Sequence, residues 1–317
     1  MMFFSAVSLA DSSVGLTIRN NGLSFGNSEY LNGIRINFVD RNVKQVNGIN
    51  LTLWQPDDHN DSTAHINGLG IGLVMPSAKV FNGVAIGGLG IEVDDFTGIA
   101  VAGLGIGGND FKGLAISSLG IGCNSFTGIG ISGLGIGADE VKGVTISGLG
   151  IGADKVHGFS ISGLGIGADE VKGITIAGLG IGGDNITGLT IAGLGSGADK
   201  MTGVGIAGLG FGGDDIEGIF VAGLGIGADR IRGVSVALGM IKAHEIHGVS
   251  IAGLHIKADE LHDLTISTFN QAVVEQRGIS IGLLNIAKEL HGLQVGILNI
   301  AHNNPSGRKI LPILNWH

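Results

Sequence analysis

The residue types that could do chemistry recur at a fixed spacing. One column holds an aspartate in successive repeats, namely Asp139, Asp154, Asp169 and Asp184. The segment LGIGADKVH around Asp154 partly matches the calcium-binding nonapeptide G-G-x-G-x-D-x-U-x, but Leu149 stands where that motif has its first glycine. Asn109 and Asn124 lie in the same column. Because Asn and Asp both cap tight turns, we expect turn capping here, and a calcium-binding β-roll-like module is the alternative.

Histidines are concentrated late in the chain. His247 and His262 share a column and should lie one turn apart, about 4.8 Å. The two histidines of HEIH are three residues apart, whereas a metalloprotease H-E-x-x-H motif needs four. The column elsewhere holds Lys142, His157, Lys172, Thr187, Glu217 and Arg232, a variability that is typical of a solvated edge. We therefore predict no metal-ligating residues.

Cys123 is the single cysteine, so no intramolecular disulfide can form. Its column otherwise reads only Gly or Ala from Gly108 to Gly213. A reactive thiol would need a cationic neighbour, and the sequence places none beside it. We predict that Cys123 fills a crowded corner and has no catalytic role.

No motif indicates catalysis. There is no Gly-x-Ser-x-Gly elbow, no phosphate-binding loop and no paired-carboxylate site, and GLGIGAD lacks the following helix of a dinucleotide fingerprint. The irregular segments WQPDDHNDST and TFNQAVVEQR offer no nucleophile with a base. We predict a non-enzyme without catalytic or cofactor-binding residues and without a cofactor; an enzyme using loop 54–63 is a further alternative.

The elements that would carry these residues are set by an internal repeat. Of 317 residues, 61 are glycine, 44% are hydrophobic and 14% are charged, which favours a folded repeat protein over a disordered one. The formal net charge of -9, without a basic stripe, argues against nucleic-acid binding. No stretch has the roughly 20 apolar residues of a membrane-spanning helix. Glycine recurs with a period of 15, at positions 83, 98, 113, 128, 143, 158, 173, 188, 203, 218, 233 and 248.

The repeat predicts an all-β fold, a single-stack β-solenoid of about 15-residue coils with N- and C-terminal caps. Apolar residues alternate at Val144 and Ile146, and again at Leu149 and Ile151, with the two-residue period of strands. We expect all four, with Val156, to point inward. Between these groups the two-residue alternation slips, and each slip indicates a corner of the coil. The slips predict a triangular coil with two strand sides and a tight turn as the third side.

The regularity of the repeat divides the chain. We expect a signal remnant or an apolar segment over 1–12, and irregular N-terminal coils with a cap over 13–67, including loop 54–63. The regular solenoid should span 68–277, and C-terminal coils and a cap should span 278–317.

Two surfaces should be distinctive. Gly148, Gly150 and Gly152 would form a bare face on which copies could self-associate. The other strand would expose Thr145 and Thr175, whose columns suggest an ice-binding or self-assembling solenoid as a further alternative.

The C-terminal text GISIGLLNIAKELHGLQVGILNIAHNNPSGRKILPILNW resembles the bacterial surface repeat-containing protein family, which repeats units such as NGLQIGLLNIA and ends in an LPILNW-like segment. The early units LNGIRINFVD and VNGINLTLW are similar too. The resemblance implies an exported protein of the cell surface or outer envelope, without an established activity. We therefore expect a non-enzymatic scaffold or interaction rod that contacts a protein or cell-surface partner.

Overall fold

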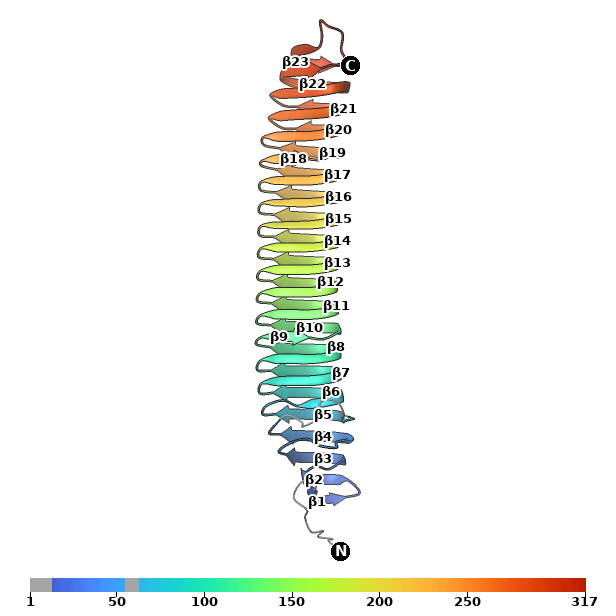
Figure 1. Ribbon diagram of the computed structural model, residues 1–317, viewed down its shortest axis with the longest axis vertical. Coiled ribbons are helices and arrows are strands. Elements are labelled where there is room, and N and C mark those ends of the chain that lie inside the picture. Colours follow the sequence, from blue (N-terminus) through green and yellow to red (C-terminus); the bar gives the residue numbers. More distant parts are fainter. Residues whose placement is uncertain (1–12, 55–62) are drawn as a thin grey trace. The chain divides into compact units, whose positions relative to one another are not determined.

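The computed structural model describes residues 13–54 and 63–317. The described chain is a β-solenoid of about 18 turns with a spacing of about 15 residues, which confirms the predicted all-β fold class. It forms two compact units, residues 1–160 and 161–317, in each of which successive turns stack on one another (Figure 1). The predicted segment 1–12 and nearly all of loop 54–63 lie outside the described residues.

Most strands are long because they continue around the corners of a turn. The strands of the first unit are β1 (Ser13–Ile18), β2 (Asn21–Gly26), β3 (Tyr30–Asn37), β4 (Gln45–Thr52), β5 (His65–Gly72), β6 (Ser77–Gly87), β7 (Gly90–Ala102), β8 (Gly105–Ser117), β9 (Gly120–Gly122), β10 (Ser125–Ser132) and β11 (Gly135–Ser147). Strand β12 (Gly150–Ser162) falls at the division between the units. The strands of the second unit are β13 (Gly165–Ala177), β14 (Gly180–Ala192), β15 (Gly195–Ala207), β16 (Gly210–Ala222), β17 (Gly225–Ala237), β18 (Met240–Lys242), β19 (Glu245–Ala252), β20 (His255–Ile266), β21 (Phe269–Ile281), β22 (Leu284–Ala301) and β23 (Ile310–Trp316).

Within each unit, consecutive turns pair in parallel and in register. In β10 and β11, Gly128 pairs with Gly143 and Ile131 with Ile146; in β14 and β15, Ile186 pairs with Met201. Each pair is 15 residues apart, so the sequence period is the length of one turn. Equivalent residues therefore form columns along the stack.

The period-15 glycines form one corner of every turn. Gly143 has φ 126°, a conformation that side chains rarely adopt, and a Cβ there would lie 2.1 Å from the carbonyl oxygen of Gly128. Glycine at this corner lets the chain turn while its backbone stays in contact with the preceding turn. Only Asp263 departs from the column among the described regular turns, with φ 68° and its carboxylate accepting a hydrogen bond from the Gly248 amide.

The strand after each corner glycine has the opposite orientation from the one predicted. Thr145 and Ser147 are buried, whereas Ile146 is 39% exposed and Val144 is partly exposed. Side chains keep one parity from Val141 to Ser147, because the glycine corner bends the strand without exchanging its faces, and Leu149 leaves this alternation at the next bend. The prediction that Val144, Ile146 and Leu149 point inward was wrong, whereas Ile151 and Val156 do lie in the core.

The interior is narrow, and its columns complement one another in size. A stack of phenylalanines in the first unit has ring centroids 4.6–5.4 Å apart, comprising Phe81, Phe96, Phe111 and Phe126. The neighbouring inward column is Ala or Gly in these turns, and a Cβ on Gly130 would lie 3.0 Å from the Phe126 ring. In the next two turns, Val141 and Val156 replace phenylalanine, and Thr145 and Ser160 replace the alanine or glycine of the neighbouring column. The hydroxyl oxygens of Thr145 and Ser160 lie 2.8 Å apart. Small polar residues thus occupy the core in hydrogen-bonded pairs.

The third side of each coil is a strand and not the predicted tight turn. Parallel pairing continues through Asn185 with Lys200 and Ile186 with Met201, and is interrupted only at the aspartate position between Gly183 and Asn185. The Asp-X position is therefore a single-residue kink, and all three sides contribute hydrogen bonds between turns.

Antiparallel strands cap the solenoid, as predicted. Strand β1 pairs with β2 at the N-terminal end, and β23 pairs with β22 at the C-terminal end. Near the C-terminal cap the core changes from aliphatic residues to amides. Asn285 accepts a hydrogen bond from Asn270 at 2.8 Å and donates one to Asn299 at 2.7 Å. These ladders satisfy polar groups that the cap buries.

Candidate functional site

The most distinctive surface is a pair of outward apolar columns, which we call the aliphatic face. It consists of the first and third residues after each corner glycine, such as Val144 and Ile146 after Gly143. Every such position in the regular turns is apolar, from Val84 to Ile281. The most exposed members are 37–48% exposed, namely Ile86, Ile99, Val101, Ile129, Ile131 and Ile146 in the first unit and Ile174, Val204, Ile206, Ile219, Val221, Ile251, Ile279 and Ile281 in the second.

Two further features accompany the aliphatic face. Leucines such as Leu134 and Leu179 occupy the next bend and are 45% and 46% exposed. On the side that follows, Gly137, Gly152 and Gly167 are exposed, and an added Cβ would meet nothing within 4 Å. Of the predicted bare face, Gly152 has this open space, whereas a Cβ on Gly148 would lie 1.9 Å from the carbonyl oxygen of Gly133, and Leu149 between them points outward. Self-association through the glycine side stays a prediction.

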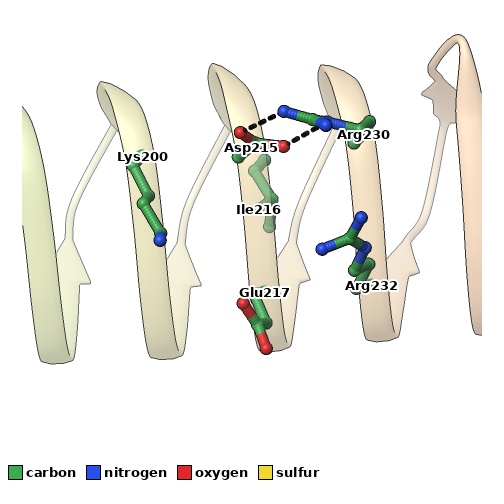
Figure 2. A pocket seen from close by; sticks show the side chains of 6 residues that line it. All are labelled: Lys200, Asp215, Ile216, Glu217, Arg230 and Arg232. Atoms are coloured by element: carbon green, nitrogen blue, oxygen red, sulfur yellow. Dashed lines mark hydrogen bonds and ion pairs between the residues drawn. The ribbon is translucent and has the colours of Figure 1, made fainter.

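The remaining side of each turn is charged. Ion pairs join residues two apart on one strand, with 2.8 Å between Lys142 and Glu140 and 2.7 Å between Arg277 and Glu275. In the second unit a groove of about 250 Å³ lies across three turns, and Figure 2 shows the bidentate pair between Arg230 and Asp215, at 2.6 and 2.7 Å. The groove is lined by Lys200, Asp215, Ile216, Glu217, Arg230 and Arg232. Both signs of charge alternate there in solvent, which is typical of a hydrated surface.

The aspartate column lies on the outside of the kink between the glycine and charged sides. Asp139, Asp154, Asp169 and Asp184 are all exposed. Within the described residues, no cluster of three or more His, Cys, Asp or Glu side chains could hold a metal ion. The calcium alternative would need six to eight oxygen ligands around one ion, far more than a single carboxylate per turn supplies.

Cys123 lies half-buried in a break between β9 and β10. Burial raises the pKa of its thiol to about 11, and the charges of Asp110 and Asp139 act in the same direction. The thiol is therefore protonated near neutral pH and a poor nucleophile.

The two histidines that share a column stack face to face instead of converging on one point. The ring centroids of His247 and His262 lie 4.2 Å apart, with an interplanar angle of 8°. Elsewhere, a hydrogen bond with Asp259 and the charges of Asp259 and Asp229 raise the pKa of His244. Burial, followed by the charge of Lys257, lowers the pKa of His255.

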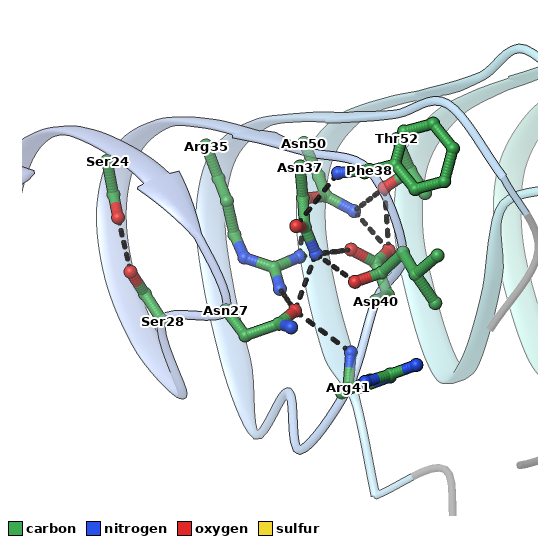
Figure 3. Close-up of polar contacts among 11 residues, drawn as sticks. Ser24, Asn27, Ser28, Arg35, Asn37, Phe38, Asp40, Arg41, Asn50 and Thr52 are labelled. Atoms are coloured by element: carbon green, nitrogen blue, oxygen red, sulfur yellow. Dashed lines mark hydrogen bonds and ion pairs between the residues drawn. The ribbon is translucent and has the colours of Figure 1, made fainter. Parts of the chain in front are cut away.

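A buried ionic cluster in the first unit was missed by sequence reasoning. Arg35 is fully buried, lies in the same inward column as Asn50, and pairs with Asp40 from the loop after β3. Asn50 accepts a hydrogen bond from Arg35 at 3.0 Å, and Thr52 donates one to Asp40 at 2.8 Å (Figure 3). The sequence feature that indicates this cluster is the occurrence of two polar residues, Arg35 and Asn50, at inward positions of consecutive turns. This cluster fills the irregular N-terminal core, and its charges are compensated internally.

The threonine array predicted on the surface is inside. Thr145 and Thr175 are 0% and 1% exposed, so these hydroxyls cannot meet ice, because the strand parity turns them into the core. In the part of the chain that the structure describes, no helix has the length and apolar character needed to cross a bilayer.

Comparison with known proteins gives no match: no family model, curated protein or solved structure is significantly similar to this chain.

Proposed function

We propose that this protein is a non-enzymatic scaffold of the bacterial cell surface or outer envelope that binds other surfaces through its aliphatic face. The observation that carries the proposal is the outward orientation of two uninterrupted apolar columns. Soluble monomers rarely expose contiguous apolar patches beyond a few hundred Å² unless the patch is an interaction site. Exported placement is supported by the resemblance of the C-terminal units to surface repeat proteins.

The electrostatics of the turn also favour this assignment. The charged residues gather on one side of each turn and the apolar residues on another, so that the aliphatic face is not interrupted by ion pairs. β-Branched side chains lose little rotamer freedom on burial, which favours binding by such a surface. A scaffold of this kind needs no reacting group.

The proposal is tested by adsorption to an octyl-coated matrix at nanomolar protein concentration. We expect retention of the wild type and much weaker retention of a double variant, Ile146→Lys with Ile206→Lys. The matched control, Gly137→Lys with Gly212→Lys, adds the same charge where an added Cβ meets nothing within 4 Å, and should be retained like the wild type. Equal retention of all three proteins would refute the proposal.

A further inference from the structure

We infer that the partner of the aliphatic face is a second copy of this chain, packed face to face; this inference rests on the proposed function. Chemically, the face requires a partner that is apolar along its whole length. Each copy offers such a surface, because every turn repeats the same outward pair of aliphatic residues.

The spacing of the columns matches a partner whose strands stack at the same interval, as those of a second copy do. Neighbouring turns are parallel strands, which lie about 4.8 Å apart, so the side chains form ridges with that period. A second copy presents ridges of identical period, and its side chains can enter the grooves at every turn. Sheets of stacked identical side chains pair through such dry interdigitation.

The available area is adequate for a stable pair. The aliphatic face runs over about six regular turns in the first unit and about eight in the second, which at about 4.8 Å per turn gives about 29 Å and 38 Å of column. Two columns separated by two residues, with their side chains, are roughly 10 Å wide. The first unit therefore offers roughly 290 Å² and the second roughly 380 Å², about 670 Å² per chain, which falls within the roughly 600–1,000 Å² per partner of a standard stable interface.

A bilayer fits the chemistry less well. The formal net charge of -9 opposes binding to anionic lipid, and the described aliphatic face contains no tryptophan or tyrosine of the kind that anchors proteins at lipid headgroups. Salt weakens the repulsion between two copies of like charge and strengthens apolar burial, so pairing should increase with salt.

Sedimentation velocity from about 1 to 100 µM tests the inference, since an interface of this size normally gives a dissociation constant within or below that range. We expect dimers for the wild type and for Gly137→Lys with Gly212→Lys, and monomers for Ile146→Lys with Ile206→Lys. A second pair, Ile146→Thr with Ile206→Thr, keeps the β-branch and should raise the dissociation constant about tenfold or more, with an unchanged circular dichroism spectrum.

Three results would overturn the inference: a wild type that stays monomeric throughout, dimers that persist in the isoleucine-to-lysine variant, or dissociation caused by the glycine-side variant alone. A monomeric wild type that is still retained on the octyl matrix through the aliphatic face would refute self-pairing and leave the proposed function intact. Loss of both properties would refute both.

Discussion

At the scale of the residue, glycine has two different roles in this chain. The corner glycines, such as Gly143, adopt a left-handed φ and touch the backbone of the preceding turn. Glycines on the bare side, such as Gly152, have space for a side chain. Composition alone cannot separate these roles, because both kinds recur with the same period.

Alanine substitution should distinguish the corner glycines from the glycines of the bare side. Gly143→Ala should destabilise the fold by roughly 1–3 kcal/mol, because a strained φ is combined with a backbone clash. Gly152→Ala should stabilise it by about 0.5–1 kcal/mol, because glycine within a strand is less favourable than alanine. Urea denaturation followed by circular dichroism measures both, and similar midpoints for the two variants would contradict this distinction.

At the scale of the element, the part of each regular strand that follows the corner glycine has aliphatic residues outside and, except at Phe220, small or polar residues inside. The repeat, the columns and the solenoid could be predicted from the sequence, because a period of 15 with glycine corners leaves few alternatives. The orientation of these side chains could not be predicted from hydrophobicity, because the core beside the phenylalanine stack accepts only residues as small as Ala100 or Gly130. The sequence feature that does indicate the orientation is size complementarity: phenylalanine in one column accompanies alanine or glycine in the next.

The orientation of the side chains around the corner glycine is tested by two substitutions to alanine. Phe96→Ala removes a fully packed ring from the stack and should destabilise the first unit by about 3–5 kcal/mol. Ile99→Ala removes a residue that is 42% exposed and should change stability by at most about 1 kcal/mol. Thermal unfolding of both variants checks this; a larger loss at Ile99 would mean that Ile99 and not Ala100 points into the core.

At the scale of the whole molecule, each turn that the structure describes within a unit contacts only the turns before and after it. Contacts between strands follow the order of the turns, as between β6 and β7 and then between β7 and β8. Stability in such a protein is approximately a sum of terms from each turn and its neighbours. A destabilising substitution in one turn should therefore affect mainly that turn and its neighbours.

Hydrogen exchange measured by mass spectrometry tests this locality. In Gly143→Ala, amides of β10 and β11 should exchange faster, because the clash is with Gly128 in the adjacent strand. Amides of β22 and β23 should keep the wild-type rate. Faster exchange throughout the chain would instead indicate a single cooperative fold.

The corner glycine column also bears on how such a chain can change its length. Each corner places a residue, glycine in nearly every regular turn, directly over the corner of the turn before, and a turn that is one residue short, as between Gly278 and Gly292, keeps this contact only through a register shift in the strand pairing. Losing or gaining one whole repeat restores the same contact between the new neighbours. Recombination between adjacent copies of the repeat in the gene would therefore produce longer or shorter solenoids that still fold, with the aliphatic face extended or shortened in proportion.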